Sequence, residues 1–142
     1  MASLKNEVVY SQETGVRAEE FQAVLASSGL GDIRPVGNLE RLQHMLDNAN
    51  LVVTARLPPD DNRLVGIARG TTDFSWFCYV SDLAVMQGLK GLGIGRGLLA
   101  HTRSILGPEV ALILVSVPDA VRFYEAAGME PLPHCFWYRR DR

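Results

Sequence analysis

Apolar residues recur at helical spacing in two stretches of the first third of the chain. In residues 18–27 they fall at positions i, i+3 and i+4, and Gly29 is placed to end the helix. Residues 38–48 repeat this spacing and open with Asn38, a favourable N-cap residue. These patterns predict two helices joined by a loop over residues 29–36. The apolar residues of the two faces are Phe21, Val24, Leu25, Leu39, Leu42, Met45 and Leu46.

Short apolar runs separated by turn residues predict strands in the middle of the chain. Residues 50–56 and 63–72 flank a stretch of proline, aspartate and asparagine at residues 58–62, and this arrangement predicts a hairpin. Residues 75–85 are aromatic and apolar at most positions, which is typical of a strand buried on both faces. The almost wholly apolar run at residues 110–115 predicts an interior strand.

The remaining segments complete an alternating order of elements. We expect an edge strand at residues 7–11 after six loose residues, and a last strand at residues 134–140. Helices are predicted at residues 94–106 and 118–127, the second opening with proline and closing at a glycine. The predicted order is therefore β-α-α-β-β-β-α-β-α-β.

Composition narrows the class of protein. With 142 residues and 47% hydrophobic content, the chain is long enough for one domain over residues 1–142. A net charge of −2 argues against nucleic-acid binding, and no apolar run is long enough to predict a membrane helix. Cys78 and Cys135 are widely spaced and the three histidines form no ligand pair. We therefore expect a cytoplasmic protein with free thiols, no metal, no nucleic-acid partner and no membrane partner.

Residues 81–102 are the most informative stretch, because a strand there turns directly into a helix through a series of glycines. Glycines at such a junction allow close approach of a ligand to the main chain, and the free N–H groups of the first helical turn favour a phosphate. Lys90 and Arg96 flank the loop with positive charge. The alternative is a glycine-rich turn that only connects two elements. The glycines are Gly88, Gly91, Gly93, Gly95 and Gly97.

Two well-known phosphate-binding motifs do not fit this loop. A dinucleotide fingerprint starting at Gly91 would require glycine at Arg96, and one starting at Gly93 would require glycine at Leu98. A Walker A loop would require lysine at Ile94. The loop is therefore of another kind.

The loop resembles the acyl-CoA pyrophosphate loop of the GNAT superfamily of N-acetyltransferases. The run Lys90-Gly91-Leu92-Gly93-Ile94-Gly95 is similar to the family pattern Q/R-x-x-G-x-G/A, with lysine as a point charge at the first position. The later run Phe123-Tyr124-Glu125-Ala126-Ala127-Gly128-Met129 resembles the family phrase F-Y-E-x-x-G-F. The chain looks like the small, single-domain bacterial members of this family. Val117 departs from an asparagine that many members carry, and Ser116 could replace its contact with the cofactor.

This resemblance implies a fold, a co-substrate and a reaction. The implied fold is α/β (α+β), with a mixed, mostly antiparallel, splayed central sheet flanked by about four helices. The implied reaction is transfer of an acetyl group from acetyl-CoA, as co-substrate, to a primary amine of a small molecule, an amino acid or a peptide. The resemblance also implies that residues 30–41 cover the acceptor pocket and set substrate selectivity, and the alternative is that the first two helices and the loop between them simply cover one face of the sheet. The implied cofactor-binding residues are Leu83, Ala84, Val85, Lys90, Gly91, Leu92, Gly93, Ile94, Gly95 and Arg96.

The resemblance also suggests catalytic residues. Tyr124 matches the tyrosine that protonates the departing thiolate, and the alternative is an aromatic core residue. Asp82 is a candidate base or ammonium anchor, and the alternative is a hydrogen-bonded structural aspartate. Strict alternation would place Tyr79 and Asp82 on opposite faces of their strand, so at most one would face the acceptor. A water chain could also serve as the base.

Two other classes of function stay open at this point, as does the oligomeric state. A non-catalytic acyl-CoA-binding module would bind the thioester without turnover, and a nucleotide-binding protein would prefer ATP or NAD. The aromatic run Phe136-Trp137-Tyr138 could support a homodimer by edge pairing.

Overall fold

The computed structural model describes residues 4–141 and shows one five-stranded sheet in the order β1-β2-β3-β4-β5. Adjacent strands are antiparallel, except that β4 and β5 are parallel. The predicted fold class, a mostly antiparallel mixed sheet with four α-helices, is confirmed for this part of the chain. In chain order, the elements are β1 (Val9–Gln12), α1 (Ala18–Ser28), α2 (Leu39–Asp47), β2 (Leu51–Leu57), β3 (Arg63–Thr72), β4 (Phe77–Val85), α3 (Ile94–Leu106), β5 (Ala111–Leu114) and α4 (Val121–Ala126).

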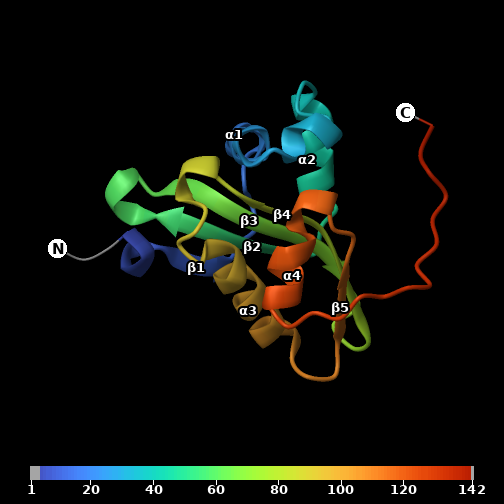
Figure 1. Ribbon diagram of the computed structural model, residues 1–142. Helices are drawn as coiled ribbons and strands as arrows, with labels where there is room; N and C mark the ends of the chain where they lie inside the picture. The colour runs from blue at the N-terminus through green and yellow to red at the C-terminus, as the bar shows by residue number, and fades with distance from the viewer. Residues whose placement is uncertain (1–3, 142) are drawn as a thin grey trace.

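The helices cover the two faces of the sheet, with α1 and α2 on one side and α3 on the other (Figure 1). Burial of the apolar stripes of these helices explains why the amphipathic segments dock on the sheet. The core on the α1 side includes Phe21, Leu25, Leu42, Val52, Ile67 and Ala84. The core on the α3 side includes Val53, Val65, Cys78, Val80, Ile94 and Leu98.

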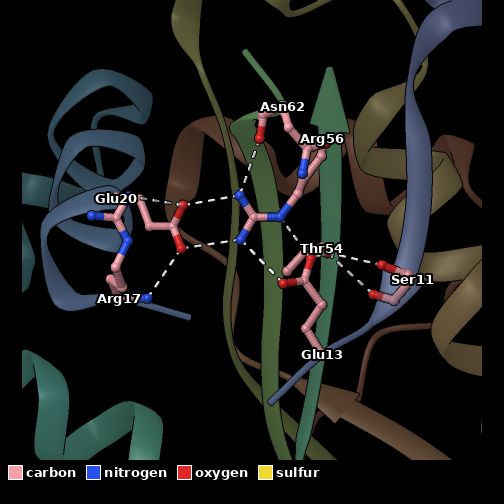
Figure 2. A network of polar contacts seen from close by, with 7 residues as sticks. All are labelled: Ser11, Glu13, Arg17, Glu20, Thr54, Arg56 and Asn62. Atoms are coloured by element: carbon pink, nitrogen blue, oxygen red, sulfur yellow. Dashed lines mark hydrogen bonds and ion pairs between the residues drawn. The ribbon is translucent and has the colours of Figure 1, made fainter. Parts of the chain in front are cut away.

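A polar network fastens α1 to the sheet. The guanidinium group of Arg56 on β2 lies between two carboxylates, donating to Glu13 from Nε at 2.7 Å and to Glu20 of α1 from Nη1 at 2.9 Å (Figure 2). It also donates to the main-chain oxygen of Asn62, and Thr54 donates to Glu13. Because Arg56 is nearly buried, these bonds satisfy a charge that would otherwise be costly at this position.

The helix ends agree with the sequence prediction where a local residue determines them. The side chain of Asn38 accepts a hydrogen bond from the Arg41 main-chain N–H at 3.0 Å, as expected of an N-cap. Gly29 ends α1 at φ +96°, a conformation in the left-handed region. The predicted hairpin of β2 and β3 is also present.

Two strand predictions near the end of the chain are wrong. The run at residues 110–115 does not form an interior strand, because β5 is the last strand of the sheet. Residues 134–140 form no strand, and Figure 1 shows the end of the chain running away from the body of the protein. Both errors have one physical cause. An apolar run predicts a strand that must be covered, but it does not specify which segment pairs with it. In this structure residues 134–140 do not pair with the outer edge of β5.

Smaller corrections concern the ends of other elements. The strand predicted at residues 75–85 begins at Phe77 and is not buried on both faces, since Trp76, Phe77 and Tyr79 are exposed. The helix predicted at residues 118–127 opens as a 3-10 turn before α4. Of the six residues expected to be loose, the first three lie outside the described part, and a 3-10 turn begins at Leu4. None of the helices within residues 4–141 combines the length and apolar content needed to cross a membrane.

Candidate active site

The strand that leads into the glycine loop is paired on both sides only at its start. β4 pairs with β5 from Phe77, opposite Ala111, to Val80, opposite Leu114. From Asp82 to Val85 it keeps its pairing with β3, but no strand within the described residues lies along its other edge. Main-chain groups of alternate residues in this half of β4, which includes Leu83, Ala84 and Val85, are therefore open to a ligand on the β5 side. The splayed sheet expected from the resemblance is present.

A β-bulge lies where β4 leaves β5. Val80 is opposite Gly70 of β3 and Asp82 is opposite Arg69, so that Ser81 is an extra residue in β4. Such a bulge twists the strand and changes the face to which later side chains point.

The bulge overturns one prediction about this strand. Val80 belongs to the core on the α3 side, whereas Ala84, four residues later, belongs to the core on the α1 side. Tyr79 therefore points to the α1 side before the bulge, and Asp82 points to the same side after it. The expectation that Tyr79 and Asp82 lie on opposite faces is wrong, because strict alternation does not hold across Ser81.

The glycine loop leaves the start of α3 without a side-chain cap. Gly93 is the N-cap residue at φ +79°, and no side chain hydrogen-bonds to the first turn. Gly91 also has a positive φ, +92°, and a β-carbon at either glycine would have no heavy atom within 4 Å. The main chain of the loop is thus accessible, and the first N–H groups of α3 are directed to that open side.

The two cations that flank the loop bind main-chain oxygens of neighbouring helices. Lys90 donates from Nζ to the oxygen of Ser28 at the end of α1, at 2.9 Å. Arg96 donates from Nη2 to the oxygen of Ala126 at the end of α4, also at 2.9 Å. Their positive charge remains beside the loop, and the same contacts link the loop to a helix on each side.

The start of α3 also determines the position of α4. A β-carbon at Gly95 would lie 2.9 Å from Cζ of Phe123, so the absence of a side chain there lets the two helices meet. Phe123 packs edge-to-face against Tyr124, with ring centroids 5.1 Å apart. Burial raises the pKa of the Tyr124 phenol above its ordinary value of 10.0, which extends the protonated form further into alkaline pH.

Asp82 is held by two arginines that the sequence reasoning did not select. Its Oδ1 accepts from Nε of Arg34 at 2.6 Å and its Oδ2 accepts from Nε of Arg69 at 2.5 Å. The Asp82 side chain has 0% exposure. This geometry fits the structural alternative, because a substrate amine cannot reach the carboxylate while Arg34 is in place. The only indication in the sequence was that an aspartate in an apolar strand requires a hydrogen-bonding or charged partner.

Arg34 also connects the α1–α2 segment to the bulge. It follows the 3-10 turn η2 (Leu30–Ile33) and donates from Nη2 to the main-chain oxygen of Ser81 at 2.7 Å. Residues 30–41, predicted to cover the acceptor, are therefore anchored where β4 separates from β5. The hydroxyl of Ser116, considered as a replacement at the Val117 position, donates to the main-chain oxygen of Val117 itself at 2.7 Å.

Comparison with known proteins agrees with this geometry. Residues 27–129 match the model of the acetyltransferase (GNAT) family. An "uncharacterized N-acetyltransferase ycf52-like" of Prochlorococcus marinus is 30% identical over 137 residues, which cover 92% of this chain and 74% of that protein. An "uncharacterized N-acetyltransferase ycf52" of Pyropia yezoensis is 28% identical over 109 residues, and the match spans 72% of this chain but 63% of the relative's length.

A solved structure shares the fold over nearly the whole chain. A candidate acetyltransferase from Deinococcus radiodurans superposes with a TM-score of 0.75 at 25% identity, covering 98% of this chain and 92% of that one. The family match and this likeness cover the split strand, the glycine loop and α4. The chain belongs to the GNAT family of acetyltransferases.

Proposed function

We propose that this protein is an acetyl-CoA-dependent N-acetyltransferase that acts on a primary amine of a small molecule, an amino acid or a peptide by direct transfer. One observation carries the proposal: the half of β4 that β5 leaves unpaired leads, through the 3-10 turn η4 (Gln87–Leu89) and the glycine loop, into the uncapped start of α3. A ligand with a pyrophosphate group and an extended amide-containing arm would match both features. The cytoplasmic location predicted from the sequence stays a prediction.

The residues of this site fit acetyl-CoA. The open main chain at Gly91 and Gly93 and the first N–H groups of α3 would hold the pyrophosphate, with Lys90 and Arg96 adding charge. The free main-chain groups around Leu83 to Val85 would hydrogen-bond the pantetheine arm and polarise the thioester carbonyl. When bound, acetyl-CoA supplies the thioester whose acetyl group moves to the amine and whose sulfur leaves as a thiolate.

The chemical steps require one proton donor and one proton acceptor. The amine nitrogen forms a bond to the acetyl carbon as the carbon–sulfur bond breaks, and Tyr124 donates its phenolic proton to the sulfur. The Tyr124 phenol is protonated at neutral pH, and burial raises its pKa above 10.0, so the proton donor stays available at alkaline pH as well. The amine proton leaves to water, and water returns a proton to the Tyr124 phenolate. Both substrates are held together, which supplies much of the acceleration.

Asp82 enters this proposal as a positioning residue. Its bonds to Arg34 and Arg69 hold the acceptor-covering segment on β4, and this role requires no contact with the amine. Its candidate role as a base or as an ammonium anchor would require Arg34 to move away and expose the carboxylate. The two roles differ in their effect on stability, and this difference can be measured.

A non-catalytic acyl-CoA-binding module is the second candidate. The inaccessible Asp82 and the valine at position 117 favour it, since each removes a contact that would serve turnover or cofactor binding. Both candidates predict binding of CoA, and only the enzyme predicts acetylated product. A protein that bound ATP or NAD more tightly than CoA would contradict both.

The deciding experiment screens amines, amino acids and lysine-containing peptides for acetyl-CoA-dependent thiol release, with mass spectrometry of the product. Calorimetry with CoA runs beside it on the wild type, Gly93→Val and Lys90→Ala. Gly93→Val should abolish binding because valine is strained at φ +79°. Lys90→Ala should weaken binding modestly and in a salt-dependent manner. Equal CoA affinity in the wild type and Gly93→Val would overturn the proposed cofactor site.

A further inference from the structure

Two largely buried guanidinium groups share a single carboxylate near the point where β4 separates from β5. Arg34 and Arg69 bind the two oxygens of Asp82, and the side chains of the arginines are 21% and 11% exposed. No other carboxylate within residues 4–141 lies at ion-pair distance from either arginine. The cluster therefore carries one positive charge in excess, at a depth where an uncompensated charge is costly.

Arg34 is the arginine that can bind a further anion. The nitrogens of Arg69 donate to Asp82, to the main-chain oxygen of Met45 and to the hydroxyl of Ser81, so this side chain is enclosed by protein groups. Arg34 is the more exposed of the two arginines. It donates once from each of its nitrogens, to Asp82 and to main-chain oxygens. Because each terminal nitrogen of a guanidinium carries a second hydrogen, Arg34 retains N–H groups for a ligand.

The position of Arg34 indicates which substrate such an anion would belong to. Arg34 binds the main-chain oxygen of Ser81 and follows η2, on the side of the sheet that α1 covers. The helix α3, whose start would hold the pyrophosphate, covers the other face (Figure 1). An anion bound by Arg34 would therefore belong to the acceptor and not to the pyrophosphate of the cofactor.

The same part of β4 offers little to a cationic group. Asp82 is the single acidic residue of β4, its side chain has 0% exposure and both of its oxygens bind arginines. Tyr79, which lies on the same face, is exposed but carries no charge at neutral pH. An excess positive charge repels an ammonium group and attracts a carboxylate.

We propose that the acceptor is an amino acid with a free carboxylate, and that Arg34 binds this carboxylate. The inference rests on the proposed function and narrows its acceptor classes to one. A carboxylate matches the planar guanidinium and offsets the excess charge.

The spacing along β4 restricts the acceptor further. Ser81, where Arg34 is anchored, and Leu83, where the thioester is proposed to lie, are about 7 Å apart along the strand. The carboxylate and the reacting amine must therefore be close together within the acceptor. A free α-amino acid meets this condition, whereas a lysine side chain inside a peptide does not.

The test compares matched acceptors with the full-length protein and acetyl-CoA. One set is phenylalanine, phenylalaninamide and phenethylamine, and a second set is leucine, leucinamide and isoamylamine. Rates are compared per neutral amine, because the amides are weaker bases. We expect kcat/KM for the amino acids to exceed that for the amides and amines by about 10- to 100-fold, as the loss of a charge-assisted hydrogen bond predicts.

Variants of Arg34 separate carboxylate binding from support of the fold. Arg34→Gln should abolish the preference for the amino acid over its amide while CoA affinity stays near wild type. A purely structural role would lower the rates with both acceptors and leave their ratio unchanged. Arg34→Lys keeps the charge without the planar fork and should retain part of the preference. Arg63→Gln is the matched control: Arg63 also pairs with an aspartate, but its side chain is 49% exposed, and the preference should stay as in wild type.

A second measurement requires no turnover. In the presence of CoA, the amino acids should raise the midpoint of thermal unfolding of the wild type by binding the folded state, and their amides should not. Arg34→Gln should lose this stabilisation, and Arg63→Gln should keep it.

The outcomes separate this inference from the proposed function. Acetylation of the amides or amines as fast as of the amino acids, or an unchanged preference in Arg34→Gln, would overturn the inference and leave the proposed function in place. Amino-acid binding that depends on Arg34, without acetylated product from any amine, would overturn the proposed function alone. A protein that neither acetylates nor binds the amino acids would overturn the inference as well.

Discussion

The ring of Phe123 occupies the space that a side chain at Gly95 would need: a β-carbon there would lie 2.9 Å from Cζ of the ring. The glycine therefore serves packing of α4 on α3, in addition to any close approach of the cofactor. Since Tyr124 is the next residue, this contact determines where the candidate proton donor lies relative to the phosphate loop.

The contact can be tested by comparing Gly95→Ala in two backgrounds. Helix propensity alone favours alanine by up to about 1 kcal/mol, whereas overpacking against the ring costs about 1–3 kcal/mol. We expect Gly95→Ala to destabilise the wild type and to stabilise the Phe123→Ala variant, as measured by urea unfolding. The same sign in both backgrounds would show that the ring does not restrict position 95.

Removing the hydroxyl of Tyr124 should affect chemistry alone. Tyr124→Phe keeps the ring, so we expect CoA affinity and stability near wild type and a loss of about 10²- to 10⁴-fold in both kcat and kcat/KM. Tyr10→Phe is the matched control. Burial raises the pKa of the Tyr10 phenol as well, but this side chain packs against Gly97 of α3 and has no proposed role in the chemistry. Unaltered turnover of Tyr124→Phe, where chemistry limits the rate, would leave water as the proton donor.

The pH profile gives a second readout for Tyr124. The phenol must be protonated to act, and burial raises its pKa above 10.0. Activity that depends on it should therefore persist to high pH, fall only above about pH 10, and lose this alkaline limb in Tyr124→Phe.

Asp82→Asn distinguishes the structural role from the catalytic one. Removing the charge leaves two arginines beside a buried neutral amide, and we expect a loss of about 3–5 kcal/mol in the free energy of unfolding. The control is Asp60→Asn, which breaks an ion pair with Arg63 whose side chains are about half exposed, and should cost under about 1 kcal/mol. A stable Asp82→Asn protein with a selectively reduced kcat/KM for the amine would instead support a base or anchor.

The network around Arg56 should make stability sensitive to acid. Hydrogen bonds from Arg56 lower the pKa of Glu20. Burial by itself would raise the pKa of Glu13, but hydrogen bonds from Arg56 and Thr54 outweigh the effect of burial, so the pKa of Glu13 is lowered as well. Since both pKa values lie below the ordinary 4.5, the stabilisation is complete above about pH 4.5 and is lost as pH falls through the lowered values.

The matching variant is Arg56→Met, which keeps an unbranched apolar stem and removes the guanidinium group with its charge. We expect a loss of roughly 2–3 kcal/mol at neutral pH, because two partly buried carboxylates then lack their cation. The difference from wild type should shrink at acid pH, where both carboxylates are protonated. Arg63→Met, at an exposed pair, should show little change at either pH, and a difference for Arg56→Met that is constant with pH would contradict the assigned roles.

The sequence by itself determined the features that depend on neighbouring residues. Asn38 caps α2, Gly29 ends α1 and Gly93 begins α3, because each supplies a local conformation or hydrogen bond that other residues supply poorly. The apolar stripes of the helices, the glycine loop and the later family motif at residues 123–129 could likewise be identified from the sequence, and they indicated the fold class and the family.

Only the tertiary structure decided features that depend on residues far apart in the chain. The extra residue at Ser81, which brings Tyr79 and Asp82 to one face, exists through pairing with Arg69 and Gly70 of another strand. Arg34 reaches Asp82 across 48 positions, and no local pattern indicates that pair. The position of β5 at the edge has the same origin, since an apolar strand specifies that it must be covered and not which segment covers it.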